Sequence, residues 1–243
     1  MSAIAWLVLP TFNEAGNIEA IVAAAVAQLE VCAEQGFRVL IVDDSSPDGT
    51  GELADRLAAT YEQVEVLHRE KREGLAPAYL DGFRRALDAG AGYVFQMDAD
   101  FSHDPADLGR LLGAIEAGAD LALGSRYVPG GGVQDWGVLR RVVSRVGCVY
   151  ARVVLSLRVR DLTGGFKCFR REVLEAIELE TVRSHGYCFQ IEMTQRALRR
   201  GFSVREVPIV FRERRRGHSK MSPRIAIEAF VVLPQLRWRG GFR

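Results

Sequence analysis

Residues 93–104 read YVFQMDADFSHD, an apolar run that passes directly into two aspartates separated by one residue. An apolar run of this length, closed by acidic residues, is typical of a buried β-strand. Residues 74–89 before it and residues 105–117 after it have helical character. A short strand between two helices predicts one unit of an α/β fold.

The same alternation continues outward in both directions. Strands are expected at IAWLVL, RVLIV, VEVLH, YVFQM and DLALG, and helices at residues 15–34, 51–61, 74–89 and 105–117. This series predicts a Rossmann-like, mainly parallel sheet with helices on both faces. Because ligands bind such sheets at the carboxyl ends of the strands, the segments PTFNE, DDSSPDGT, DADFSHDP and SRYVPGGG are predicted to surround a site.

Two common kinds of site are excluded by pattern. Neither G-x-G-x-x-G nor G-x-x-x-x-G-K-[ST] occurs, so the sheet lacks a dinucleotide fingerprint and a P-loop. The cysteines are far apart and form no C-x-x-C pair, which favours reduced thiols over a disulfide framework or a zinc site: Cys32, Cys148, Cys168 and Cys188.

The net charge of +1 conceals an asymmetry along the chain. Residues 1–120 hold 8 Lys or Arg against 21 Asp or Glu, residues 121–204 hold 14 against 7, and residues 205–243 hold 10 against 3. The acidic part suits a divalent cation, and the basic parts suit phosphates on a nucleotide, a lipid or a membrane surface. Scattered, solvated charge is the alternative. The length of 243 residues and the 48% hydrophobic content favour one large domain.

Asp98 and Asp100 are candidate ligands of a hard divalent cation bound to a diphosphate, because two carboxylates so close repel each other unless positive charge lies between them. Asp-x-Asp also occurs in ordinary turns, and only its place at a strand end favours the metal site. Asp43 and Asp44, after the second strand, could accept hydrogen bonds from a ribose or a base. Asp48 is interpreted instead as turn and helix-cap chemistry.

The second half contains an amphipathic basic helix over residues 137–157, with apolar residues at spacings of 3, 4 and 7. This helix either packs on the sheet or lies on a membrane surface. Ser222 and Pro223 are expected to begin a last helix that Pro234 ends or kinks, before the tail RWRGGFR. With no leader and no apolar run near the roughly 20 residues that span a bilayer, we expect a cytosolic protein, peripheral on the cytoplasmic face of a membrane.

The motifs LPTFNE, VDDSSPDGT, DAD and GSRY, in this order, resemble those of the family-two glycosyltransferases with the GT-A fold. GGGVQDW, LTGGFKCFRREVL and FRERRRGHSKMS are similar to segments of the dolichol-phosphate mannose synthases, also called polyprenol monophosphomannose synthases. The resemblance implies inverting transfer of mannose from GDP-mannose to polyprenyl phosphate, with Mg²⁺ or Mn²⁺ as cofactor. It implies a catalytic domain over residues 1–221, with a nucleotide-sugar half to about 126 and an acceptor half from about 127. Residues 222–243 would form a C-terminal helix and basic tail.

The resemblance also implies a set of site residues. It assigns the donor guanosine to Pro10, Phe12, Glu14, Val42 and Asp44, the diphosphate and metal to Asp98, Ala99 and Asp100, the donor phosphates to Arg126, Arg214 and Lys220, and the acceptor phosphate to Arg140 and Ser144. The expected catalytic residues are Asp98, Asp100 and Arg126. Ser102 is a candidate third metal ligand, although some members carry a longer amide side chain there. Phe12 stands where many members have Tyr, which keeps the ring and removes the hydroxyl.

Charge supports this assignment independently. Arg126, Arg140, Arg214 and Lys220 are too many cations for one sugar but fit three phosphates. A phosphomonoester acceptor, with a second pKa near 6, is already largely a dianion at neutral pH, so no general base is required. His103 remains a candidate site residue because it follows the DAD loop directly.

Several alternatives stay open. The same chemistry could use another sugar, such as glucose from UDP-glucose. A noncatalytic nucleotide-sensing or scaffold protein could retain the fold. Nucleic-acid binding is disfavoured, because the basic half contains no recognisable reading module. The expected partners are GDP-mannose, a polyprenyl phosphate lipid, the membrane surface and, as an alternative to direct attachment, a membrane-anchoring protein.

Overall fold

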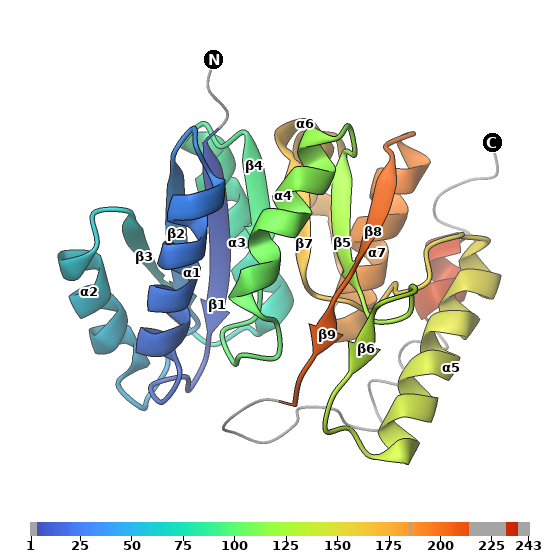
Figure 1. The fold of residues 1–243 in the computed structure, drawn as a ribbon, viewed down its shortest axis with the longest axis horizontal. Helices are drawn as coiled ribbons and strands as arrows, with labels where there is room; N and C mark the ends of the chain where they lie inside the picture. The colour runs from blue at the N-terminus through green and yellow to red at the C-terminus, as the bar shows by residue number, and fades with distance from the viewer. Residues whose placement is uncertain (1–3, 185, 214–231, 238–243) are drawn as a thin grey trace.

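A central sheet organises the computed structural model, which describes residues 4–184, 186–213 and 232–237 (Figure 1). In this part of the chain the sheet has seven strands in the order β3-β2-β1-β4-β7-β5-β8. Their bounds are β1 (Ala5–Thr11), β2 (Phe37–Asp43), β3 (Val64–His68), β4 (Tyr93–Gln96), β5 (Leu121–Ser125), β7 (Lys167–Arg170) and β8 (Val204–Pro208). All pair in parallel except β7, so the predicted mainly parallel sheet is confirmed.

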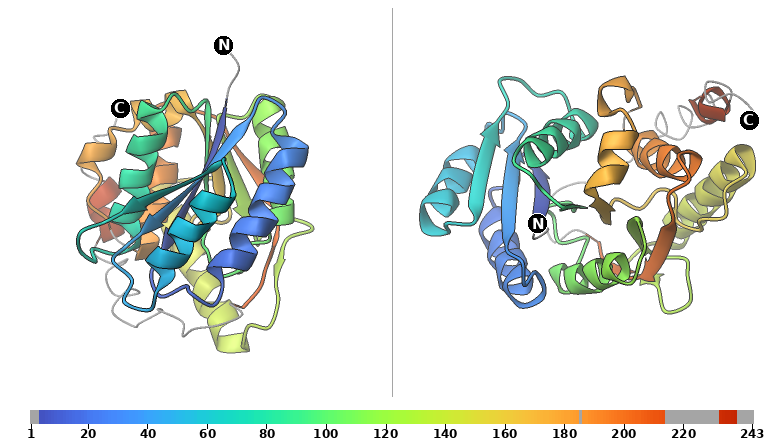
Figure 2. Two further views of the ribbon diagram at one scale, coloured as in Figure 1. Left: turned by 90° about the vertical axis from the view of Figure 1, so that its left-hand side faces the viewer. Right: turned by 90° about the horizontal axis from the view of Figure 1, so that it is seen from above.

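Helices cover both faces of the sheet, as the sequence predicts (Figure 2). One face carries α1 (Ile18–Cys32), α2 (Thr50–Thr60) and α4 (Leu108–Glu116). The opposite face carries α3 (Leu75–Asp88), α6 (Arg171–Ala176) and α7 (Gly186–Arg199). Two short 3₁₀ turns, η1 (Pro105–Asp107) and η2 (Leu179–Thr181), complete the connections.

The central strands β1, β2, β4 and β5 are almost wholly apolar, as expected for strands that helices bury on both sides. On β1, Leu7 and Leu9 pack against the helices of one face, while Trp6 and Val8 pack against those of the other. This division follows from the alternation of side chains along an extended strand. The apolar runs of the sequence therefore form the middle layer of a three-layer structure.

Strand β7 was missed by the strand pattern. It is antiparallel to both β4 and β5 and pairs Gln96 with Lys167. Its four residues, KCFR, begin and end with a basic residue and are too few to stand out as an apolar run. Its direction brings the preceding residues 163–165 to the sheet edge where β4 and β5 end, so the second half of the chain reaches the predicted site.

The amphipathic helix is confirmed as α5 (Val138–Leu155), beside a two-stranded ribbon of β6 (Gly132–Val133) and β9 (Val210–Phe211). Its inner residues Ala151 and Leu155 join a small core that also contains Leu233. Residues 232–237 are helical, so Pro234 does not end the last helix, and the alternative that Pro234 kinks this helix stays a prediction. The expected start of that helix, at Ser222 and Pro223, lies outside the described residues. In the described part of the chain, none of the helices combines the length and the apolar character needed to cross a membrane.

Gly82 of α3 tests this packing. A Cβ there would lie 2.4 Å from Cγ1 of Val8 and 3.1 Å from Cγ2 of Val42. The backbone of α3 can therefore approach β1 and β2 this closely only because residue 82 has no side chain. We expect Gly82→Ala to lower the free energy of unfolding by about 1–3 kcal/mol, as overpacking does. Gly113→Ala on α4, where a Cβ meets nothing within 4 Å, is the control and should be neutral or slightly stabilising. Equal urea-denaturation midpoints for wild type and Gly82→Ala would contradict the close approach.

Candidate active site

A cavity of about 390 Å³ opens at the carboxyl ends of β1, β2, β4 and β5. Its wall includes most of the residues that the sequence singled out: Pro10, Phe12, Glu14, Asp44, Asp98, Ala99, Asp100, Ser102, His103, Arg126 and Arg140. Val42 is not among them, because its side chain points into the core under α3. Ser144 also lies outside the cavity wall. Arg214 and Lys220 fall outside the described residues.

Neighbouring side chains hold the DAD loop after β4 in place. The hydroxyl of Tyr79 donates to Oδ1 of Asp98 at 2.9 Å, and the backbone N–H of Ser102 donates to Oδ1 of Asp100 at 2.9 Å. Burial, together with the charges of Asp98 and Asp100, raises the pKa of Tyr79 well above its usual value. The phenol therefore remains a donor over the whole neutral range and orients the first carboxylate.

His103 supports the same loop and is not a free base. Its ring is buried against Phe166, with centroids 5.1 Å apart, and its Nδ1 accepts the backbone N–H of Asp98 at 3.2 Å. Burial lowers the pKa of His103, although Asp98 and Asp100 act in the opposite direction. The neutral imidazole thus carries its proton on Nε2 and uses Nδ1 to position Asp98.

The carboxylates of Asp98 and Asp100 fit a divalent cation. Both line the cavity, and Asp100 is only 5% exposed. Across the described residues, no group of three or more His, Cys, Asp or Glu could hold a metal ion. A cation here would rest on these two carboxylates and on oxygens from its ligand and from water. The Ser102 side chain lies in the same wall.

At the end of the cavity near β1 and β2, an unpredicted loop follows β3. Arg72 places its guanidinium 3.8 Å from the ring centroid of Phe12, and both line the cavity. Asp44 holds this loop by accepting from Arg69 and from the backbone N–H of Gly74 at 2.7 Å. Ligand sites lie at the carboxyl ends of parallel strands, and VEVLH is one of the predicted strands. Applying this rule to the segment after VEVLH would have identified the loop that carries Arg72.

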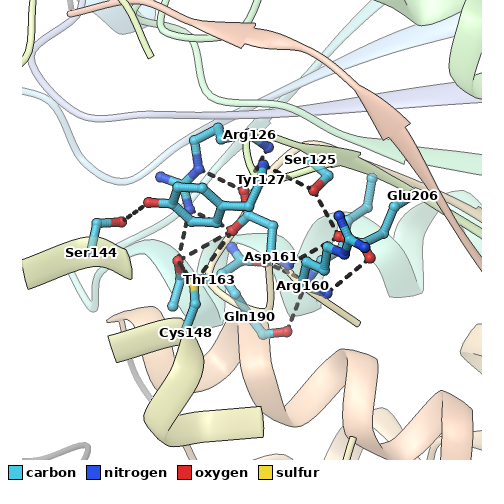
Figure 3. Close-up of polar contacts among 11 residues, drawn as sticks. Ser125, Arg126, Tyr127, Ser144, Cys148, Arg160, Asp161, Thr163, Gln190 and Glu206 are labelled. Carbon is cyan, nitrogen blue, oxygen red and sulfur yellow. Dashed lines mark hydrogen bonds and ion pairs between the residues drawn. The ribbon is translucent and has the colours of Figure 1, made fainter. Parts of the chain in front are cut away.

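Arg126 lies in the cavity wall within a buried ion pair (Figure 3). Its Nε and Nη2 donate to the two carboxylate oxygens of Asp161 at 2.7 and 2.6 Å, and Nη2 also donates to Oγ1 of Thr163 at 2.7 Å. Burial opposes both charges, but each charge outweighs it for the other: Asp161 raises the pKa of Arg126, and Arg126 lowers the pKa of Asp161. Within the described residues Nη1 has no hydrogen-bond partner, so only part of this guanidinium is left for a phosphate.

The two residues expected at the acceptor phosphate are separated by the structure. Arg140 reaches the cavity, where it stacks over the Trp136 ring at 4.2 Å and pairs with Glu213 at 2.7 Å. Ser144, one turn further along α5, instead accepts a hydrogen bond from the Tyr127 hydroxyl at 2.7 Å. Its role on the acceptor therefore stays a prediction, and the structure gives it a different partner.

A family model described as "Glycosyl transferase family 2" matches residues 6–178. The chain belongs to this family. It is a glycosyltransferase, as the strand-end motifs predicted, and the central βαβ region that carries Asp98 and Asp100 lies wholly within the match.

Two relatives of this glycosyltransferase show which members of the family it resembles most specifically. It is 48% identical over 235 residues to a polyprenol monophosphomannose synthase of Mycolicibacterium smegmatis, covering 96% of the chain and 87% of the relative. It is 44% identical over 237 residues to an undecaprenyl-phosphate mannosyltransferase of Micrococcus luteus, covering 96% of the chain and 95% of the relative. The predicted resemblance to polyprenol monophosphomannose synthases is confirmed.

Solved structures confirm the GT-A fold. Glucosyl-3-phosphoglycerate synthase of Mycobacterium tuberculosis, with Mn²⁺, UDP-glucose and phosphoglyceric acid, superposes with a TM-score of 0.67 at 19% identity, covering 98% of this chain and 80% of that one. A mannosyltransferase of Pyrobaculum calidifontis, with GDP-Man and Mn²⁺, gives a TM-score of 0.60 at 17% identity, with 97% and 73% covered.

The Arg126–Asp161 pair should stabilise the glycosyltransferase. Asp161→Asn leaves the buried guanidinium without its counter-charge, which typically costs about 3–5 kcal/mol of unfolding free energy. Glu175→Gln, which neutralises the exposed partner of Arg171, is the matched control and should change stability by no more than about 0.5 kcal/mol. In an Arg126→Met/Asp161→Asn double variant, part of the loss should be recovered. Strict additivity of the two single changes in urea denaturation would rule out coupling through the pair.

Proposed function

We propose that this glycosyltransferase transfers mannose from GDP-mannose to the phosphate of a polyprenyl lipid, with inversion at the anomeric carbon and with Mg²⁺ or Mn²⁺. The observation that carries the proposal is one cavity bounded by the Asp98 and Asp100 carboxylates and by Arg140 of α5, a helix with an exposed apolar face. The names of the relatives from M. smegmatis and M. luteus support the acceptor and the sugar. The nucleotide-sugar half would end near Arg126, and the acceptor half would follow it.

The donor would lie along β1, β2 and β4. Phe12 and Arg72 offer a ring and a planar cation for a nucleobase, and Glu14 lies beside them in the wall. Asp98 and Asp100 would hold the divalent cation, which supplies Lewis-acid neutralisation of the leaving diphosphate. We propose that Arg126 adds positive charge near the donor phosphates through Nη1, and that Arg214 and Lys220 do the same.

The reaction needs no proton transfer. An oxygen of the lipid phosphate dianion would form the new bond to the anomeric carbon as the bond from that carbon to GDP breaks. GDP would leave with the electron pair of that bond and so gain one negative charge, while the acceptor phosphate would lose one. This agrees with the state of His103, whose Nδ1 is already engaged by the Asp98 backbone. The chain's own contribution would be alignment and charge stabilisation.

The acceptor's location calls for contact with a membrane surface. The apolar residues of α5 divide between two environments: Tyr150, Val154 and Leu155 pack on the small core, while seven others are 41% to 78% exposed, namely Val138, Leu139, Val142, Val143, Val146, Val149 and Val153. Exposed apolar side chains flanked by arginines are typical of a helix that lies in a lipid interface. We therefore propose peripheral attachment at the cytoplasmic face through α5, with recruitment by an anchoring protein as the alternative.

The metal assignment predicts that Asp98→Ala and Asp100→Ala abolish transfer, because the diphosphate would lose its cation and would face the remaining carboxylate. Transfer is measured as radiolabelled mannose passing from GDP-mannose into an organic extract with polyprenyl phosphate and Mg²⁺. Asp104→Asn is the control, since this neighbouring aspartate caps η1 and pairs with Arg212 away from the cavity. UDP-glucose and other donors complete the panel. Near wild-type turnover of Asp100→Ala would refute the metal site. Labelling of the lipid from UDP-glucose and not from GDP-mannose would refute the proposed donor.

The α5 surface predicts reversible, salt-sensitive binding to anionic vesicles. Replacing Val142, Val146 and Val153 with Ser should weaken binding at least about tenfold, because three exposed apolar side chains are lost. Val31→Ser is the control, because Val31 is 80% exposed on α1, a different helix. Co-sedimentation at low and high salt measures the effect. Folded wild-type enzyme that ignores vesicles at both salt concentrations would favour an anchoring partner instead.

A further inference from the structure

Gln190 of α7 brings an amide to the cavity from the face of the sheet opposite α1 and α4. The side chain is only 3% exposed, yet it lines the cavity. Its Oε1 accepts from Nζ of Lys167 at 2.8 Å and from Nε2 of Gln96 at 2.7 Å. Lys167 also donates to the backbone carbonyl of Gln190 at 2.8 Å. Both acceptor positions of the amide oxygen are therefore occupied from the core side.

Lys167 fixes the direction in which this amide points. It is fully buried on β7, and burial lowers its pKa to about 7. A lysine has at least two N–H groups in either protonation state, which suffice for the two oxygens of Gln190. Turning the amide over would place its NH₂ against the N–H donors of Lys167, so Oε1 faces the core. Nε2 must then face away from Lys167, and it donates to no residue in the described part of the chain.

The nitrogen points into a small space above Gly165. The position that a Cβ of Gly165 would occupy lies 3.5 Å from Nε2 of Gln190, 3.7 Å from Oδ2 of Asp98 and 3.4 Å from Cε1 of His103. The other oxygen of Asp98 already accepts from Tyr79. The space is thus bounded by one amide donor and one carboxylate acceptor. A hydroxyl can accept from the first and donate to the second, whereas a phosphate oxygen could only accept and would face the Asp98 charge.

We propose that Gln190, oriented by Lys167, and Asp98 both form hydrogen bonds to one hydroxyl of the transferred sugar. This pair would help to determine which sugar the enzyme transfers. This inference rests on the proposed function for the identity of the donor. Gln190 would touch the substrate, while Lys167 would act only as a positioning residue. Residues of two elements outside the nucleotide-sugar half, β7 and α7, would then contribute to donor choice.

The test compares Gln190→Leu with wild type in binding GDP, GDP-mannose and the monodeoxy analogues of GDP-mannose, by calorimetry without acceptor. Wild type should bind one analogue about tenfold more weakly than GDP-mannose, the usual size of a lost hydrogen bond in a sheltered site. In Gln190→Leu that difference should vanish, GDP-mannose should bind about tenfold more weakly, and GDP should bind as before. Gln195→Leu, a buried glutamine of the same helix outside the cavity, is the matched control.

Two further variants keep the inference falsifiable if Gln190→Leu does not fold. Gln190→Glu keeps the shape and gains an ion pair with Lys167, but it replaces the donor by an acceptor and should lose the same discrimination. Lys167→Met should reduce the difference in affinity between GDP-mannose and that analogue. It should also raise the KM for GDP-mannose more than it lowers kcat. Equal weakening of GDP and GDP-mannose, or an unchanged ranking of the analogues in Gln190→Leu and Gln190→Glu, would overturn the inference. If wild type uses UDP-glucose instead, the proposed donor fails, and UDP with deoxy-UDP-glucose repeats the test.

Discussion

The concentration of negative charge at the end of β4 is the constraint on which the rest of the site depends. Asp98 and Asp100 both follow β4, which ends at Gln96, and both line one cavity. A Tyr79 phenol that stays protonated holds the first carboxylate, and a neutral His103 supports the loop through its backbone. Both supports are buried and uncharged, so neither of them neutralises the carboxylates, which suit a cation.

The positive side of the cavity is built differently, with each described arginine restrained by an acid or a ring. Arg126 is held by Asp161, Arg140 by Glu213 and Trp136, and Arg72 by the ring of Phe12. Such restraint lowers the conformational entropy that a phosphate or base contact would otherwise lose on binding. The restraint of Arg126 is the strongest, because its partner Asp161 is fully buried.

The antiparallel insertion of β7 joins the two halves of the chain. Because β7 runs against its neighbours, the segment before it reaches the same edge as the carboxyl ends of β4 and β5. Thr163 and Gly165 thereby enter the cavity wall, and Lys167 stands opposite Gln96 in the register. A parallel strand at this place would have put those residues at the far edge of the sheet. The local direction of four residues thus determines which part of the second half meets the first.

Local patterns in the sequence were enough to predict strands β1 to β5, the helices α1 to α4 between them, the DAD loop at a strand end and the amphipathic helix α5, because each depends on spacing within a few residues. They did not predict the parallel strand β8, whose sequence VREVP carries two charged residues. They could not predict β7, whose short run carries no clear period. Nor could they predict contacts between distant residues: Arg126 meets Asp161 across 35 positions, and Gln96 meets Gln190 across 94. Val42 matched a motif, yet the pleat of β2 turned it into the core. Which face of α5 is exposed, and which way the Gln190 amide points, were decided only by the tertiary structure, because both follow from the partners that the folded sheet brings within a few ångströms.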